Sequence, residues 1–351
     1  MKLKYLAFTA ALTALPVTAF ADSYTATIAA GHPLVFRGVK VISEVFVPTV
    51  AAEMEKAGHS ITFSEQYGGA IAKVGEELEA VEAGLAEIGT CQALFDPAKL
   101  AVQNVTYYTP FTTSDIAKVS AIIGDMHANL PAMTQAYGEN GVVYIGAPIV
   151  IDDYLLMTSF PVASLADLDG RKIAAPGAAI NWLSGTGAVG VSGNLTTYYN
   201  EIKTGVYDGV IVFASAALPS KLYEVAPYIT KAGLGAQYAG SLCANAGWWD
   251  GLPDEAKAAI TAGADAAGAR YVEQLEAAVT ASLTAMGAAG ATIQDAPSDM
   301  RATWAAGMDN AARAWAADLD ARGVPASEVL STYMNAMRDA GATPLRNWDT
   351  E

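Results

Sequence analysis

Apolar and polar residues alternate along the chain in patterns typical of both strands and helices. Short apolar or alternating runs predict strands, and apolar residues repeated every three or four positions predict helices. Strands are predicted at 24–29, 61–65, 86–93, 142–146, 155–158, 189–191 and 238–245, and helices at 36–56, 74–83, 114–137, 179–184, 253–288, 298–321 and 326–340. This alternation of the two element types predicts an α/β fold.

One pattern occurs twice: an amphipathic helix ends in glycine, and an acidic residue then leads into an apolar strand. The first unit contains Gly84 and Glu87, and the second contains Gly205 and Asp208. Glycine suits the left-handed residue that ends a helix, so the chain turns directly into a sheet beneath that helix. Two such units far apart in the sequence predict two similar α/β lobes. Proteins with two lobes usually bind a ligand in the cleft between them.

The first 21 residues have the features of a secretory signal peptide. Lys2 and Lys4 precede an apolar run, and Ala19-Phe20-Ala21 fits the small-x-small cleavage rule. The run is shorter than the roughly 20 residues of a membrane span and contains Pro16, which disfavours a transmembrane anchor. Cleavage after Ala21 and export to the periplasm are therefore expected.

The net charge excludes some partners. It is −16 for the whole chain and becomes −18 once the two leader lysines are removed. A surface this acidic repels nucleic acid and anionic lipid, which are bound through clustered Lys and Arg. We therefore expect neither as a partner.

Few residues are suited to redox, metal or catalytic chemistry. Cys91 and Cys243 are expected to be buried free thiols, although export would allow them to pair. The three histidines lie far apart in sequence, so no metal or other cofactor is expected. The run 185–190 matches G-x-G-x-x-G, but a helix precedes it and a strand follows. This context is the reverse of a dinucleotide site and favours a structural turn.

Several segments together resemble one protein family. They are the signal peptide, Tyr67-Gly68-Gly69 followed by a helix, the stretch 165–173, the stretch 203–209 and the long helix 253–288. In this order they resemble the DctP-type solute-binding proteins of TRAP (tripartite ATP-independent periplasmic) transporters. The resemblance implies a two-lobed, type II-like periplasmic binding protein with a long helix across both lobes. Lobe I would comprise 22–148 and 235–275, and lobe II 149–234 and 276–351.

The resemblance also implies a carboxylate grip that this chain lacks. An arginine that typically binds the ligand's carboxylate corresponds here to Ala174. A frequent asparagine corresponds to Val212, which Phe213 follows, and a second arginine falls near Tyr154 or Leu155. Arg37 is a candidate replacement because it begins a helix, and Lys73 is a second because its turn faces the cleft in this family. The candidate ligand-binding residues are Arg37, Lys73, Phe95, Tyr154, Trp182, Asn194, Phe213, His32 and Asn181.

These features favour a receptor over an enzyme. No G-x-S-x-G, phosphate-binding loop or H-E-x-x-H motif occurs. The expected function is capture of a small organic acid, aromatic or 2-oxo/hydroxy, by lobe closure and its delivery to TRAP membrane subunits by a monomer. Under a second hypothesis, Asp96, Asp152 or Asp153 helps to hold an amine against aromatic faces. The sequence also leaves open a neutral solute and, as a different class of protein, a secreted hydrolase.

Overall fold

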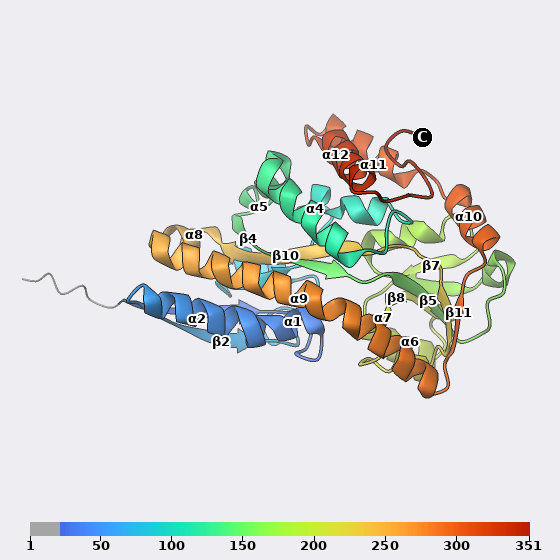
Figure 1. Cartoon of the computed structure of the whole chain (residues 1–351), viewed down its shortest axis with the longest axis horizontal. Helices are drawn as coiled ribbons and strands as arrows, with labels where there is room; N and C mark the ends of the chain where they lie inside the picture. The colour runs from blue at the N-terminus through green and yellow to red at the C-terminus, as the bar shows by residue number, and fades with distance from the viewer. Residues whose placement is uncertain (1–21) are drawn as a thin grey trace, which may run out of the picture.

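The computed structural model describes residues 22–351, so the predicted signal peptide lies outside the described residues. The first lobe is built on a five-stranded sheet and the second on a six-stranded sheet (Figure 1). The first sheet has the order β2-β1-β3-β10-β4, and its strands are β1 (Ser23–Ala29), β2 (Ser60–Gln66), β3 (Ile88–Cys91), β4 (Val142–Ile151) and β10 (Gln237–Asn245). The second has the order β11-β9-β5-β8-β6-β7, with β5 (Tyr154–Thr158), β6 (Lys172–Ala175), β7 (Val189–Ser192), β8 (Gly209–Phe213), β9 (Tyr228–Lys231) and β11 (Thr292–Asp295).

Both sheets mix parallel and antiparallel pairs. In the first, β1 runs parallel to β2 and β3, while the late strand β10 lies antiparallel between β3 and β4. In the second, β6 runs parallel to β7 and β8, and β5 lies antiparallel between β8 and β9. The return of β10 to the first sheet confirms the prediction for 238–245. The two-lobed α/β fold is therefore present.

The repeated helix-glycine-acid-strand unit has the same geometry in both lobes. Helix α3 (Glu77–Glu82) ends at Gly84, and α6 (Tyr198–Lys203) ends at Gly205, both with positive φ (+71° and +77°). The acidic residue then holds the neighbouring parallel strand: Glu87 accepts a hydrogen bond from the Thr27 N–H (2.6 Å), and Asp208 from the Lys172 N–H (2.8 Å). In both lobes the acid satisfies a backbone N–H directly before the point where the two parallel strands begin to pair.

Helix α9 (Asp254–Ala288) extends across both lobes (Figure 1). It packs against α2 (Val47–Lys56) and β4 of the first lobe and against α7 (Ala214–Ala217) and β11 of the second. Gly263 makes the close approach possible, because a Cβ there would lie 2.4 Å from a methyl carbon of Val50. The predicted long helix is confirmed.

The remaining helical segments complete the two lobes. They are α1 (Arg37–Val41), η1 (Ile42–Phe46, π-helical), η2 (Ala101–Tyr108), α4 (Ile116–Asn129), α5 (Pro131–Gly138), η3 (Leu165–Leu168), η4 (Gly177–Leu183), η5 (Leu222–Glu224), α8 (Ala246–Asp250), α10 (Ser298–Gly307), α11 (Ala311–Ala321) and α12 (Ala326–Asp339). Two predicted helices are each divided in two. Pro131 begins α5, since proline suits the first turn of a helix. The helix predicted at 298–321 stops at Met308, and Asn310 caps α11 by accepting from the Arg313 N–H.

The expected lobe boundary between residues 148 and 149 falls inside strand β4. Ala147 in this strand has a positive φ of +51°, and the register of β4 with β10 shifts at three places. The backbone is therefore irregular where the chain passes from one lobe to the other. The full set of boundaries stays a prediction.

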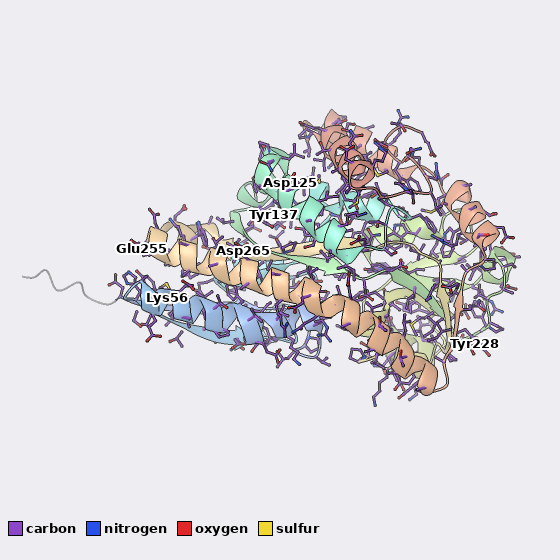
Figure 2. All side chains as sticks on the ribbon, viewed as in Figure 1. Lys56, Asp125, Tyr137, Tyr228, Glu255 and Asp265 are labelled. Carbon is purple, nitrogen blue, oxygen red and sulfur yellow. A yellow bond between two sulfur atoms is a disulfide. The ribbon has the colours of Figure 1, made fainter. Side chains whose placement is uncertain are left out.

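Acidic side chains lie on the outer helices (Figure 2). Asp125 on α4 and Glu255 and Asp265 on α9 are all exposed, as expected for a chain of net charge −16. Within residues 22–351, no helix combines the length and apolar character needed to cross a membrane.

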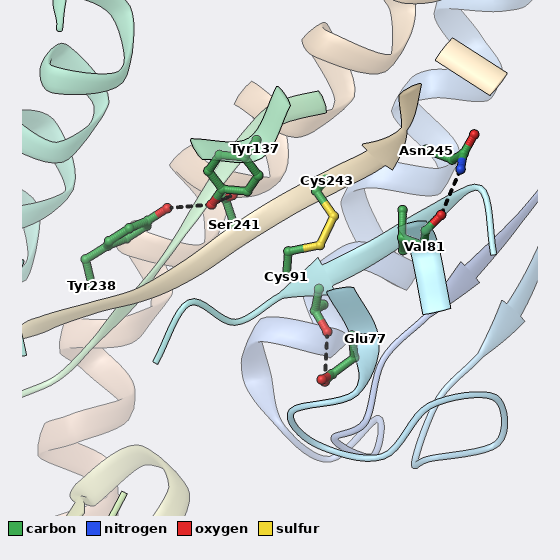
Figure 3. Close-up of a disulfide and its surroundings, with 9 residues drawn as sticks. Glu77, Val81, Cys91, Tyr137, Tyr238, Ser241, Cys243 and Asn245 are labelled. Carbon is green, nitrogen blue, oxygen red and sulfur yellow. Dashed lines mark hydrogen bonds between the residues drawn. A yellow bond between two sulfur atoms is a disulfide. The ribbon is translucent and has the colours of Figure 1, made fainter. Parts of the chain in front are cut away.

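Cys91 and Cys243 form a disulfide between β3 and β10 (Figure 3), so the expectation of free thiols is wrong. Their Cα atoms are 5.8 Å apart, within the range that a disulfide bridges. The strand register brings them together, because Cys91 lies opposite Ser241 and Cys243 opposite Gly89. The two cysteines are 152 residues apart in the sequence, so the sequence alone does not show that they lie close together.

Candidate functional site

A small cavity lies between the two lobes. Its free volume is about 30 Å³, room for roughly two water molecules. The lining residues come from both sheets and the segments that follow their strands: His32, Phe36, Gln92, Leu94, Phe95, Tyr107, Ile151, Tyr154, Pro176, Leu195, Tyr198, Ile211, Val212, Phe213 and Ala239. A solute of more than a few atoms requires the lobes to stand farther apart than they do here.

A chain of hydrogen bonds fixes the polar wall of the first lobe. Gln92, just after β3, uses its amide nitrogen to donate to Glu77 (3.1 Å) and to His32 Nδ1 (3.0 Å). Glu77 is buried and also accepts from the N–H groups of Gly31 and Gly75. Burial raises the pKa of Glu77. Since the amide nitrogen can only donate, His32 Nδ1 accepts and its proton lies on Nε2.

His32 is neutral at pH 7, because burial lowers its pKa to about 4. Its ring stacks on Phe36, with ring centroids 4.6 Å apart. Phe36 in turn meets Phe213 of the second lobe edge to face (6.4 Å). These contacts join the two lobes at the entrance side of the cavity.

Aromatic rings form most of the opposite wall. The hydroxyls of Tyr107 and Tyr154 are hydrogen-bonded to each other at 2.9 Å. Trp182 lies behind them: it stacks on Tyr107 (5.7 Å), and its indole N–H donates to the Tyr107 carbonyl (2.7 Å). Tyr154 also meets Phe213 edge to face at 5.3 Å. The rings brace one another, so the wall is held in one arrangement.

Tyr198, at the start of α6, is the exception among these polar side chains. It is 1% exposed, and within residues 22–351 its hydroxyl has no hydrogen-bond partner. Burial, with smaller effects of Tyr207 and Tyr107, raises its pKa well above the usual value. A buried hydroxyl without a partner costs free energy, which singles out this position.

Four of the nine predicted ligand-binding residues line the cavity: His32, Phe95, Tyr154 and Phe213. The structure places Trp182 behind the wall, as described above. The side chain of Asn194 accepts from the backbone N–H and hydroxyl of Thr196 in its own turn (3.0 and 2.6 Å).

The two predicted cations and Asn181 are not among the lining residues. Arg37 donates to Gln274 on α9 at 3.2 Å, and Lys73 is exposed. Asn181 lies in η4 and is partly buried.

Sequence reasoning missed several lining residues, chiefly Gln92, Tyr107 and Tyr198. Tyr107 belongs to η2, a segment with no predicted element. Gln92 carried a usable signal, since it is a polar residue near the end of the apolar strand predicted at 86–93 and close to the first glycine-acid unit. Tyr198 opens the helix of the second unit, but a tyrosine there is indistinguishable from a core residue.

The cavity wall carries no formal charge at pH 7. Among the described residues, no Lys, Arg, Asp or Glu lines it. Asp152 accepts from the backbone N–H of Ser215 (3.2 Å) and from its hydroxyl (2.5 Å), and Asp153 accepts from the Gly235 N–H (2.7 Å). Within residues 22–351, no three His, Cys, Asp or Glu side chains are grouped so that they could hold a metal ion.

A surface groove of about 320 Å³ adjoins the cavity and shares His32, Phe36 and Leu195 with it. Val35 of the first lobe, which is 63% exposed, and Tyr199 of the second lobe border this groove. The shared residues mark where the cavity meets solvent.

Comparison with known proteins gives the same architecture. The family model described as "Bacterial extracellular solute-binding protein, family 7" (DctP) matches residues 50–318. DctP7 of Bordetella pertussis, an extracytoplasmic solute receptor binding pyroglutamic acid, superposes with a TM-score of 0.75 at 20% identity, covering 88% of this chain and 99% of that one. A TRAP periplasmic solute-binding protein of Roseobacter denitrificans with bound β-D-glucuronate has a TM-score of 0.74 at 18% identity, with coverage of 88% and 99%.

A marine metagenome TRAP solute-binding protein specific for pyroglutamate is also similar, with a TM-score of 0.73 at 19% identity and coverage of 90% and 99%. No curated protein matches the sequence. The structural neighbours show the fold, while the family model covers most of the chain. The chain therefore belongs to the bacterial extracellular solute-binding proteins of family 7, the DctP family.

Proposed function

We propose that this protein is the periplasmic receptor of a TRAP transporter and captures one small organic solute between its lobes. The observation that carries the proposal is the cavity, because its wall combines His32 and Gln92 of the first lobe with Tyr154, Tyr198 and Phe213 of the second. A solute that touches both lobes stabilises the closed form over the open one and shifts the population toward closure. The closed receptor then delivers the solute, unchanged, to membrane subunits.

Two observations bear on the class of solute. Three neighbours described above bind organic acids, namely pyroglutamate and glucuronate, which favours a small acid. The uncharged cavity wall of this chain favours a solute without a carboxylate. Both classes are compatible with receptor function by lobe closure.

A thermal-shift screen of residues 22–351 against a few hundred small acids, amines and neutral solutes tests the receptor function. A solute at 100 times its dissociation constant adds about 2.7 kcal/mol of stability, which raises the melting temperature measurably. Recovery of the solute chemically unchanged after incubation supports a receptor over an enzyme. A screen in which no solute raises the melting temperature contradicts the proposal.

A further inference from the structure

The cavity offers hydrogen-bond donors but no formal charge. Tyr198, Tyr107 and Tyr154 all line this small space. Tyr107 and Tyr154 share a single hydrogen bond, so one of these two hydroxyls keeps an unused hydrogen. The Tyr198 hydroxyl keeps its own, since it has no partner within residues 22–351. Two O–H donors are therefore available to an acceptor atom placed between the lobes.

The carboxylates of Glu77 and Asp152, near the cavity, are held by hydrogen bonds from the protein. Glu77 receives hydrogen bonds from Gly31, Gly75 and Gln92, and Asp152 receives them from Ser215. Arg37 donates through one nitrogen to Gln274 on α9, while its buried Nε has no partner within residues 22–351. Because Arg37 is not among the residues that line the cavity, and no other described Lys, Arg, Asp or Glu is, a charged solute would enter without a counterion in contact with it.

Burying an ion without a counterion is costly. The penalty for transferring one unpaired charge from water into a protein interior lowers affinity by roughly a hundredfold or more. An uncharged carbonyl or hydroxyl group pays a much smaller penalty, which hydrogen bonds from tyrosine hydroxyls offset. The surrounding rings of Phe36, Phe95 and Phe213 then cover the apolar part of the solute.

We infer that the solute is an uncharged organic molecule whose carbonyl or hydroxyl oxygen accepts a hydrogen bond from the Tyr198 hydroxyl. This inference rests on the proposed receptor function and specifies its substrate class. It also explains why a hydroxyl that is otherwise unpaired stands in the wall of the cleft.

The first experiment measures affinity by calorimetry for matched sets of three solutes that share one skeleton and differ in charge. One set is 2-pyrrolidinone, pyroglutamate and pyrrolidine, and another is benzyl alcohol, benzoate and benzylamine; further sets are built on each skeleton that the thermal-shift screen finds. The uncharged member should bind at least roughly tenfold more tightly than its anion and its cation. Tighter binding of the anion or the cation overturns the inference but leaves the receptor function intact. A thermal-shift screen without any hit instead contradicts the receptor function itself.

The second experiment replaces Tyr198 by Phe. Loss of one neutral hydrogen bond should weaken binding of the best uncharged solute roughly fivefold. The unfolding midpoint of the solute-free protein should stay the same or rise, because no protein partner is lost. Tyr333→Phe is the matched control, since both tyrosines are 1% exposed, and it should leave affinity unchanged. Unchanged affinity in Tyr198→Phe, or a fall in solute-free stability with it, overturns the role of this hydroxyl.

Discussion

Removal of the disulfide between Cys91 and Cys243 should destabilise the protein substantially. The bridge joins positions 152 residues apart, so it lowers the conformational entropy of the unfolded chain. The loop-closure relation gives about 5 kcal/mol at 25 °C for a loop of this length, and removal of native disulfides typically costs about 2–5 kcal/mol. For the 330 residues of the range 22–351, this corresponds to a fall in melting temperature of roughly 3–7 °C.

The assay is urea unfolding of the Cys91→Ala/Cys243→Ala double variant, followed by circular dichroism with and without reductant. Reductant should lower the midpoint of the wild type and leave that of the double variant unchanged. A thiol reagent should find no free thiol in the oxidised wild type and two after reduction and unfolding. The loop-closure reasoning is refuted if the double variant unfolds at the same urea concentration as the oxidised wild type.

The remaining predictions concern the turn at Gly185, the buried acid Asp96 and the cation Arg37. Gly185→Ala should cost more than about 2 kcal/mol, because φ is +74° and a Cβ would lie 2.1 Å from the Gly307 carbonyl oxygen; Gly170→Ala, at φ +68° in open space, should cost only about 1 kcal/mol by urea unfolding. Burial raises the pKa of Asp96 to about 7 from the usual 3.8. Below pH 4, Asp96 is protonated in both the folded and the unfolded protein and costs no stability. As the pH rises to 7, the unfolded protein favours the ionised carboxylate and stability is lost, so Asp96→Asn should raise the melting temperature more at pH 8 than at pH 4. Equal shifts at both pH values would contradict this. Arg37→Ala should change the affinity for an uncharged solute less than about twofold, and loss of binding would restore Arg37 as the ligand's cation.

Local sequence determined the elements and much of the architecture. Gly84 and Gly205 end their helices with positive φ as predicted, because only local backbone conformation is involved. The acidic residues after them, Glu87 and Asp208, were visible in the pattern, but their hydrogen bonds to Thr27 and Lys172 were not. Those partners belong to other strands, which only the sheet brings alongside.

The candidate site also contains residues that the sequence could predict and residues whose position depends on packing. Residues next to strand ends, such as Tyr154 and Phe213, were predicted as ligand contacts and do line the cavity, because a strand end places its neighbours at the edge of a sheet. Trp182 has the same aromatic character, yet it packs behind the wall and donates to the Tyr107 carbonyl. Hydrophobic character alone does not say which ring is one layer closer to the cleft.

By itself, the sequence determined two α/β lobes, the long helix and an alanine at position 174, where the family resemblance implies a carboxylate-binding arginine. Each depends on periodicity or on residue identity, which are properties of short segments. Only the tertiary structure decided that Cys91 meets Cys243, that Arg37 turns to α9 and that the Tyr198 hydroxyl is left without a partner at the cleft. These depend on contacts between segments distant in the chain. The packing of the two lobes creates such contacts, and no local pattern encodes them.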